Sequence, residues 1–387
     1  MLDKLGAKWA EISLDAVRFN MEAIQARIGK RSVTAVVKAD AYGHGAVEIA
    51  RCAQETGIRM LGVSSVDEGI ELRENFIDLD IIVFGAPVES QACDCINYRL
   101  TPSVASKHFA EYLNAECRRL KKRIDVHICV DTGMGRVGPE AEQAVPLVKY
   151  LINLEHINVT GIYSHFSCAD EDYSFSRHQL GRYTELVKTL DTEGLVIPFR
   201  HIANSAGILE LEESYFDMVR PGLLIYGIYP YGNPGKGPDR LKVRRALTMK
   251  TKVVYVKEVP EGTPLSYGKT YTTKDKTRIA TLPVGYADGF SRSFSNRGEV
   301  LINGRRFTVS GNVCMDMMMV DVGRHPVSQG DEVVIIGSQG KEEITVYEMA
   351  SKLGTIPYEV ISLIGKRVPR LYINRGKPVV LKKLSRG

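Results

Sequence analysis

The chain has 387 residues, 25% of them charged and 44% hydrophobic, with a formal net charge of +5, which predicts a globular protein of two domains or one large barrel with an appendage. Its basic stretches, at 118–123 and at the C-terminal end, lack interleaved aromatic residues, and no apolar run could span a membrane, so neither nucleic-acid binding nor membrane insertion is expected. Seven cysteines without a CxxC pair, and no histidines clustered near Cys93 and Cys95, predict a cytoplasmic location and no metal site.

From residue 14 to about 228, short apolar strands alternate with amphipathic helical stretches. Ser65 and Glu68 form a capping-box pair at one helix start. Eight strands in this arrangement predict a (β/α)8 barrel, with an open doubly wound sheet as the alternative. The predicted strands are 32–37, 60–64, 80–85, 100–104, 124–130, 157–163, 198–203 and 216–220.

The pattern changes after a connection at 229–239 that is rich in proline and glycine. Alternating β-type runs follow, including a hairpin whose turn is Asn303-Gly304, and a helix that begins with Thr345 and Glu348 as a capping box. The sequence therefore predicts a barrel domain over 1–239 and a mostly β domain over 240–387. Whether the first dozen residues pair with the second domain stays open.

Polar side chains follow several predicted barrel strands. In AVVKADAYGHGA, Lys38 closes the first strand, where a lysine is either a solvated strand end or a desolvated amine that acts as a nucleophile. Because barrel enzymes carry their chemistry at the C-terminal ends of the strands, these residues predict one shared site. Its other candidates are Arg136, His165, Asn204, Ser205, Arg220 and Gly222.

Two stretches resemble phosphate-binding motifs, and only the second supports a bound cofactor. The GMGRVG stretch at 133–138 matches a dinucleotide fingerprint, but the acid at Glu155 precedes the next strand instead of closing it, which argues against a nucleotide. The loops after the seventh and eighth strands are common phosphate sites in barrels, and Ser205, Gly222 and Leu223 suit that role. A phosphate site opposite a strand-end lysine indicates pyridoxal 5'-phosphate.

The motifs AVVKADAYGHG, DTGMGR, YSHF, ANSA, MVRPGLLIYG, LSYGKTYTT, LPVGYADGFSR and VCMDM occur in that order. Together they resemble the alanine racemases across nearly the whole chain. The resemblance implies a fold-type III pyridoxal-phosphate enzyme with a barrel and a β domain. It also implies a homodimer with shared active sites that supplies D-alanine for peptidoglycan.

The resemblance implies a role for each matching residue. Lys38 would carry the cofactor and act as one base, and Tyr267 of the partner chain would act as the other. Arg220 would bond the pyridine nitrogen, His165 would link Arg220 to Tyr267, and Arg136 with the N–H of Met315 would hold the substrate carboxylate. The phosphate would be held by Tyr42, Ser205, Gly222, Leu223 and Tyr358, and Asn204 would also bind the cofactor. The entrance would be lined by Asp170, Tyr286, Arg292 and Asn312.

The chain departs from the family pattern twice. Cys129 stands where a carbamylated lysine is usual beside the arginine, and Gly311-Asn312 stands where Gly-Arg usually precedes CMD. We expect a small anion such as chloride, in preference to a thiolate at Cys129, to replace the missing carbamate charge beside Arg136. Both bases are retained, so racemisation is expected while the choice of substrate stays open.

Three other functions stay open at this point. The departures permit a racemase of broader or serine preference. A decarboxylase of the same fold is disfavoured by Arg220 and the LSYGKTY segment, because decarboxylases usually place an acid at the pyridine nitrogen. A non-catalytic pyridoxal-phosphate carrier is disfavoured because carriers of this type are barrels alone, without the second domain that brings Tyr267.

Overall fold

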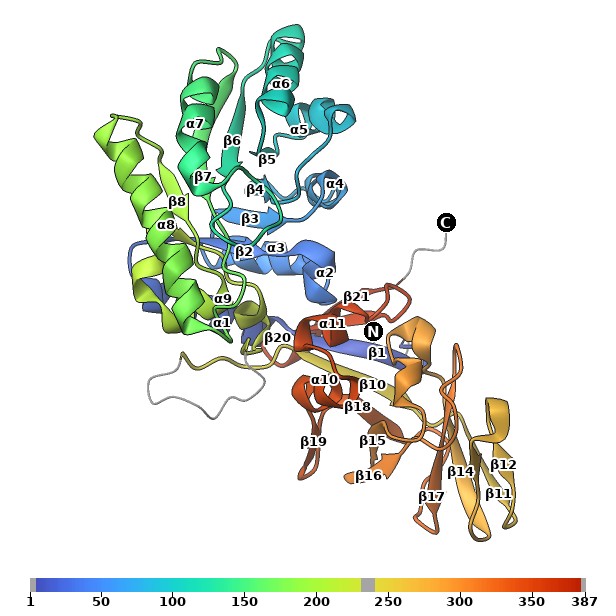
Figure 1. The fold of residues 1–387 in the computed structure, drawn as a ribbon. Helices are drawn as coiled ribbons and strands as arrows, with labels where there is room; N and C mark the ends of the chain where they lie inside the picture. Colours follow the sequence, from blue (N-terminus) through green and yellow to red (C-terminus); the bar gives the residue numbers. More distant parts are fainter. Residues whose placement is uncertain (1–4, 231–240, 384–387) are drawn as a thin grey trace. The chain divides into compact units, whose positions relative to one another are not determined.

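The computed structural model describes residues 5–230 and 241–383 (Figure 1). The chain divides into two compact units: a barrel unit of Val17–Ala41 with Ala46–Arg244, and a β-rich unit of Met1–Ala16, Tyr42–Gly45 and Arg245–Gly387. From residue 231 on, the connection predicted at 229–239 lies outside the described residues, and so does the domain boundary predicted after 239. Over 5–230 and 241–383, no helix has the length and apolar character that crossing a membrane requires.

The barrel unit contains a row of eight parallel strands in the order β8-β7-β6-β5-β4-β3-β2-β9. Backbone hydrogen bonds from Asp217 to Arg200 and from Arg220 to Ala203, of 3.1 and 2.9 Å, link the two ends of the row. The (β/α)8 prediction is confirmed, and an open doubly wound sheet is excluded because the order never reverses. The strands are β2 (Ser32–Val36), β3 (Met60–Val63), β4 (Asp80–Val83), β5 (Thr101–Val104), β6 (Ile124–Cys129), β7 (Ile157–Tyr163), β8 (Phe199–His201) and β9 (Met218–Val219).

Helices alternate with the strands along the chain and lie beside them in the barrel unit (Figure 1). The predicted capping box is confirmed: Ser65 Oγ accepts from the N–H of Glu68, and Glu68 accepts from the N–H of Ser65. The helices are α1 (Leu14–Ile28), α2 (Lys38–Tyr42), α3 (Ala46–Glu55), α4 (Val66–Glu74), α5 (Ala92–Asn97), α6 (Lys107–Leu120), α7 (Ala144–Ile152), α8 (Tyr173–Thr192) and α9 (Ser205–Glu210).

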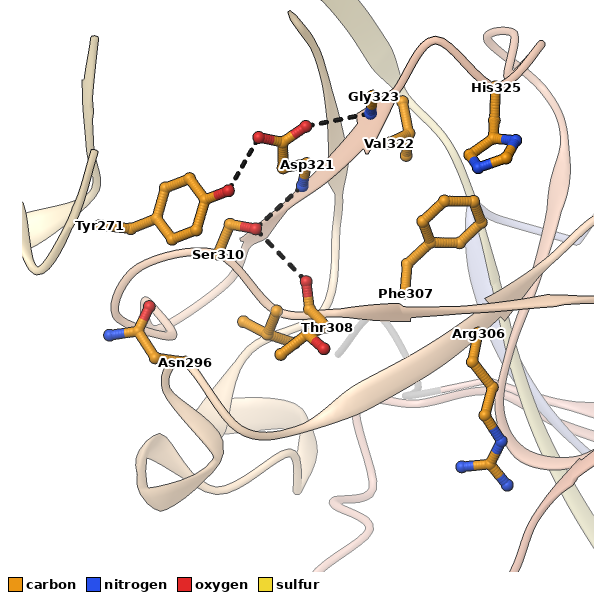
Figure 2. A pocket seen from close by; sticks show the side chains of 11 residues that line it. Tyr271, Asn296, Arg306, Phe307, Thr308, Ser310, Asp321, Val322, Gly323 and His325 are labelled. Carbon is orange, nitrogen blue, oxygen red and sulfur yellow. Dashed lines mark hydrogen bonds between the residues drawn. The ribbon is translucent and has the colours of Figure 1, made fainter. Parts of the chain in front are cut away.

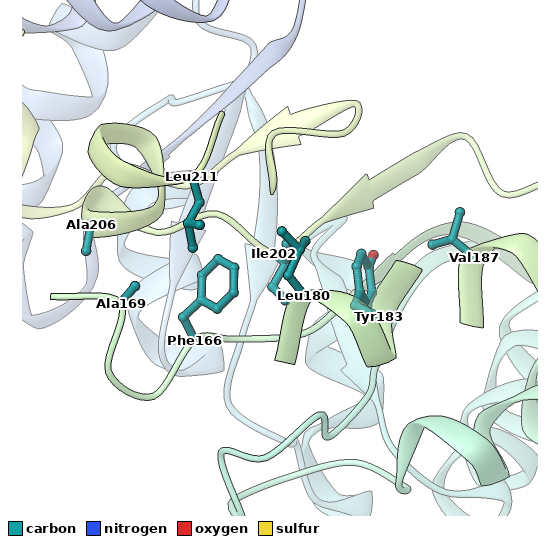
Figure 3. Close-up of a cluster of buried hydrophobic side chains, with 8 residues drawn as sticks. All are labelled: Phe166, Ala169, Leu180, Tyr183, Val187, Ile202, Ala206 and Leu211. Atoms are coloured by element: carbon teal, nitrogen blue, oxygen red, sulfur yellow. The ribbon is translucent and has the colours of Figure 1, made fainter. Parts of the chain in front are cut away.

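One buried cluster supports the loops that follow β7 and β8. Leu180, Tyr183 and Val187 recur at helical spacing on α8 and pack with Phe166 and Ile202, as Figure 3 shows. The Tyr183 hydroxyl, fully buried, donates to the carbonyl of Ile162 at 2.7 Å. Each such side chain contributes roughly 1.5–3 kcal/mol on burial, so the C-terminal ends of these strands have a rigid base.

The β-rich unit is built on a sheet in the order β16-β15-β18-β10-β1-β20-β21, with β19 paired to β18. β1 (Lys8–Ser13) is antiparallel to β10 and parallel to β20, so the N-terminal strand belongs to this sheet. The other strands are β10 (Leu247–Lys252), β15 (Glu299–Ile302), β16 (Arg305–Thr308), β18 (Glu332–Gln339), β19 (Glu342–Ile344), β20 (Arg370–Asn374) and β21 (Lys377–Lys382).

Smaller elements complete the unit. The predicted Asn303-Gly304 hairpin joins β15 and β16, with both turn residues at positive φ, 51° and 74°. The predicted helix after Thr345 is α10 (Val346–Leu353), and α11 (Pro357–Ser362) follows it. A three-stranded sheet contains β11 (Tyr255–Val259), β14 (Thr277–Leu282) and β17 (Met318–Gly323), and a two-stranded one contains β12 (Pro264–Leu265) and β13 (Tyr271–Thr272).

Candidate active site

Lys38 begins a left-handed turn at the end of β2. The next four residues, Ala39 to Tyr42, all have φ between 51° and 53°, although none is glycine. Such a conformation costs roughly 1–2 kcal/mol per residue, so it persists only where surrounding contacts impose it. Two contacts do so here: the N–H of Ala41 donates to Val37 at 2.8 Å, and Asp40 accepts from the N–H of Ala46 at 2.9 Å.

Glu68 lies against the same turn. Its carboxylate accepts from the N–H of Ala39 at 2.6 Å and from the N–H of Ser64 at 2.7 Å. The capping residue of α4 therefore also fixes the main chain directly after Lys38. The pKa of Lys38 is lowered, first by burial and then by Arg136, while Glu68 opposes the shift and Arg220 adds to it. A lowered pKa increases the neutral amine, which favours the nucleophile interpretation over a solvated strand end.

Arg220 lies at the centre of the barrel unit's polar core, with 4% of its surface exposed. Its Nη1 meets Nδ1 of His201 at 2.6 Å, and its Nη2 donates to the carbonyl of Ser164 at 2.6 Å and meets Nδ1 of His165 at 3.2 Å. Burial lowers the pKa of Arg220 to about 10, which leaves it charged at neutral pH. Burial, and after it the charge of Arg220, hold the pKa of His165 well below its usual value.

Sequence reasoning missed the two histidines behind Arg220. His201 on β8 and His127 on β6 are fully buried, and Nε2 of His201 lies 2.9 Å from Nδ1 of His127. Because a guanidinium only donates, Nδ1 of His201 must accept, and its Nε2 then carries the proton that points at His127. Burial and Arg220 lower the pKa of both imidazoles, that of His127 to about 3. The available signal was a single histidine within each of two predicted barrel strands, now β6 and β8.

The loops after β8 and β9 are joined by Ser205. Its hydroxyl accepts from the N–H of Gly222 at 2.9 Å and from the N–H of Leu224 at 3.4 Å. Asn204 caps α9, where its side-chain oxygen accepts from the N–H of Gly207 at 2.9 Å. Leu223 follows Gly222 directly as the first residue of a 3-10 turn (Leu223–Tyr226). The barrel-unit residues predicted to bind the cofactor therefore lie on two loops that hydrogen bonds connect.

Asp131 organises the loop that carries Arg136. Its carboxylate accepts from the backbone N–H groups of Gly133, Met134 and Arg136 at 2.7, 2.9 and 3.1 Å. Cys129, at the end of β6, is buried and donates from Sγ to the carbonyl of Val137 at 3.4 Å. Burial raises the pKa of the Cys129 thiol, so the side chain is neutral at pH 7. Asp170 lies on the loop before α8.

The β-rich unit holds the remaining predicted residues. Tyr42 and Tyr358 lie together, with ring centroids 6.0 Å apart. The segment that follows Tyr42 is held by Arg370, which donates to the carbonyl of Gly43 at 3.0 and 3.1 Å, and by Tyr372, which donates to the carbonyl of His44 at 3.0 Å.

Tyr286 and Met315 lie on adjacent loops. The N–H of Tyr286 donates to Cys314 and that of Ala287 donates to Met315, each at 3.1 Å. Arg292 begins a 3-10 turn (Arg292–Phe294) shortly after them. Tyr267 lies on a 3-10 turn (Tyr267–Lys269) with 73% of its surface exposed. The side-chain amide of Asn312, a residue predicted for the entrance, donates to the carbonyl of Tyr267.

A pocket of about 450 Å³ in the β-rich unit contains none of the predicted site residues (Figure 2). Its central acid, Asp321, accepts from the hydroxyl of Tyr271 at 2.8 Å and from the N–H of Gly323 at 3.0 Å. Those bonds serve the local fold of the unit. Among the residues that the structure describes, no group of three or more histidine, cysteine, aspartate or glutamate side chains is placed to hold a metal ion.

Comparisons with known proteins agree along most of the chain. Residues 12–230 match the family profile "Alanine racemase, N-terminal domain", and residues 246–372 match "Alanine racemase, C-terminal domain". An alanine racemase of Carboxydothermus hydrogenoformans is 42% identical over 367 residues, which is 94% of this chain and 99% of that protein. One of Desulforamulus reducens is 43% identical over 370 residues, 94% of this chain and 98% of that protein.

Solved structures give the same result. The alanine racemase of Clostridium difficile 630 superimposes with a TM-score of 0.92 at 37% identity, covering 98% of each chain. That of Bacillus anthracis, solved with bound L-Ala-P, has a TM-score of 0.92 at 34% identity and covers 97% of each chain. The two profiles, these relatives and the confirmed barrel followed by a mostly β unit show that the chain belongs to the alanine racemase family.

Proposed function

We propose that this protein is an alanine racemase that interconverts L-alanine and D-alanine with pyridoxal 5'-phosphate and two bases, Lys38 and Tyr267. The observation that carries the proposal is the environment of Arg220. Its guanidinium is paired with two imidazoles of lowered pKa and with backbone carbonyls. A cation kept charged in this way suits the weak electron withdrawal that racemisation needs, whereas an acid at the same place would favour other reactions.

The residues of the barrel unit fit the proposed cofactor. The charges of Arg136 and Arg220 both act on Lys38, and Glu68 is the acid that opposes them. An anionic phosphate and a substrate carboxylate would complement this excess of positive charge. Lys38 would attach the cofactor covalently, and Ser205, with the backbone of Gly222 and Leu223, would hold its phosphate. The resemblance assigns Tyr42, Asn204 and Tyr358 to the same cofactor.

When bound, pyridoxal phosphate makes the proton on Cα of an amino acid acidic. The chain must then remove that proton from one face and return one on the other, which requires two bases of different reach. Lys38 suits one face because its lowered pKa increases the share of neutral amine that can accept a proton. A tyrosine with an ordinary pKa of about 10 is almost entirely protonated at neutral pH, so Tyr267 needs nearby positive charge to act as a base. Because the pKa of His165 is lowered, its imidazole is neutral, and the positive charge would come from Arg220, which contacts His165.

We also propose a homodimer in which Tyr267 serves the partner chain. The high exposure of Tyr267 within a single chain supports this arrangement, since a catalytic tyrosine should lie inside an active site and a partner chain would enclose it. None of the seven cysteines, all within the described residues, forms a disulfide, which supports a reducing, cytoplasmic location. The role would be supply of D-alanine for peptidoglycan, as the family resemblance implies.

A racemase of broader or serine preference is the second candidate. The neutral, buried Cys129 favours it, because the carboxylate-binding arginine lacks the fixed negative neighbour that the family pattern supplies. Incubation of the holoenzyme with separate L-amino acids, followed by chiral chromatography, tests both candidates. Alanine should racemise fastest, with serine slower but measurable. Serine faster than alanine would select the second candidate, and carbon dioxide release without a D-isomer would refute both.

A further inference from the structure

We propose that Asn312 is a positioning residue that holds the main chain of Tyr267 and thereby sets the reach of its phenol. The inference rests on the proposed role of Tyr267 as a base. It concerns a position at which this chain departs from the usual family residue, and it adds a role to the one predicted for Asn312 at the entrance.

The turn that carries Tyr267 is strained and weakly supported by its own strands. Ser266 and Lys269 have φ of 65° and 50°, a region that side-chain-bearing residues rarely adopt. The flanking strands β12 and β13 have two residues each, so the hairpin supplies little backbone pairing. Contacts from outside the hairpin must therefore hold it.

Asn312 supplies such contacts in both directions. Its side-chain Nδ2 donates to the carbonyl of Tyr267 at 2.6 Å, and its own backbone carbonyl accepts from the hydroxyl of Ser266 at 2.5 Å. Because the Tyr267 carbonyl only accepts, the group that faces it must be the amide NH2. A carboxylate of the same shape would place a negative oxygen against that carbonyl.

The neighbouring residues allow this close approach. Gly311 has φ of 88°, and a Cβ there would lie 2.8 Å from Cβ of Ser266, so the position requires glycine. The N–H of Gly311 donates to Asn296 at 2.6 Å, and Nδ2 of Asn296 lies 3.1 Å from the hydroxyl of Thr270. Two asparagines therefore hold the turn, one at Tyr267 and one at Thr270.

The short amide suits this geometry better than the arginine of the family pattern. Arginine is longer, carries a permanent charge and has no compact amide to place at 2.6 Å from the carbonyl of Tyr267. In this chain the turn is therefore fixed by a neutral hydrogen bond. A change at Asn312 should act on the tyrosine base and leave the lysine base largely unaffected.

The experiment compares Asn312→Asp and Asn312→Ala with the wild type and with Tyr267→Phe. The holoenzymes are mixed with L-alanine or D-alanine in deuterated water, and loss of the α-proton is followed in a single turnover. Both Asn312 variants should slow proton loss from L-alanine by about tenfold, the effect of one lost hydrogen bond, and change that from D-alanine by less than about threefold. Amide hydrogen exchange in the peptide around 264–272 should become faster, whether or not the cofactor is bound.

Asn303→Gly is the matched control. It removes an amide-to-carbonyl bond of the same kind, from Asn303 to Pro326 at 3.3 Å, together with the bond from the same amide to Asp331 at 2.9 Å, in the same unit and at a turn that glycine tolerates. This control should change neither the rate of proton loss from L-alanine or D-alanine nor the amide hydrogen exchange of residues 264–272. Equal slowing in both directions, or unchanged exchange in the Asn312 variants, would overturn the inference. If Tyr267→Phe itself shows no directional loss, the proposed base role fails instead.

Discussion

Nη1 of Arg220 donates to Nδ1 of His201 across 2.6 Å inside the barrel. This bond fixes the tautomer of His201 and keeps the imidazole neutral, because an acceptor nitrogen cannot also be protonated. It also connects Arg220, which directly follows β9, to β8. These two strands lie side by side where the barrel closes.

Removing this acceptor should destabilise the barrel. His201→Leu leaves a buried guanidinium N–H unpaired, which should lower the free energy of unfolding by about 2–3 kcal/mol, and His201→Asn should lower it less. Urea unfolding of the three proteins without cofactor measures the difference. His127→Leu is the comparison, because it leaves only the neutral Nε2–H of His201 without its acceptor, whereas His201→Leu leaves a charged donor without one. A larger loss from His127→Leu than from His201→Leu would contradict the tautomer assignment.

Lys38 should be the attachment point of the cofactor. Lys38→Ala should lose the visible absorbance of bound pyridoxal phosphate, and borohydride reduction of the wild type should leave the label on Lys38 alone. Peptide mapping by mass spectrometry checks this. A label on another lysine would refute the site.

The lowered pKa of Lys38 has a definite consequence for pH. Between the folded pKa and 10.5, the unfolded chain binds more protons at this lysine than the folded chain does, so Lys38 makes the cofactor-free protein more stable as pH rises through that window. Because Glu68 raises the pKa of Lys38, Glu68→Gln should lower that pKa further, so the stabilisation should begin at a lower pH. Urea unfolding at a series of pH values, with Lys38→Met as the reference, measures it. An identical pH slope in wild type and Lys38→Met would contradict the assignment.

Much of the fold followed from the sequence, but several parts of the site did not. The eight strands and the Asn303-Gly304 hairpin were predictable because apolar period and turn residues are local signals. The left-handed turn after Lys38 was not, because its residues are Ala, Asp, Ala and Tyr, and no local preference selects that conformation.

Contacts between distant segments explain the other omissions. Glu68 was predicted only as a capping residue, yet it also binds the N–H of Ala39, 29 positions away in sequence. The contact between His127 and His201 spans 74 positions, and that between Tyr267 and Asn312 spans 45. No sequence period reports such pairs, since the fold alone brings them together.

Cys129 should behave as a neutral thiol. Its raised pKa rules against a thiolate as the partner of Arg136, so a small anion such as chloride remains the expected partner. Removal of halide should raise the KM for alanine with little change in kcat, and Cys129 should react slowly with iodoacetamide at pH 8. Full activity without halide, combined with fast alkylation, would restore the thiolate hypothesis.

The shared site predicts complementation between inactive chains. Lys38→Ala and Tyr267→Phe homodimers should each have little activity, but exchanged heterodimers should contain one intact site and recover up to half of the wild-type activity per dimer. Native mass spectrometry verifies the exchange. Heterodimers that form but stay inactive would show that Tyr267 does not serve the partner chain.

The most direct test of the two-base account is α-proton exchange by Tyr267→Phe in deuterated water, measured in a single turnover from each alanine enantiomer. The account predicts that proton loss from L-alanine falls by two or more orders of magnitude, in the range of a lost general base, while loss from D-alanine to Lys38 stays within about tenfold of the wild type. Equal losses from both enantiomers, or none from either, would contradict it.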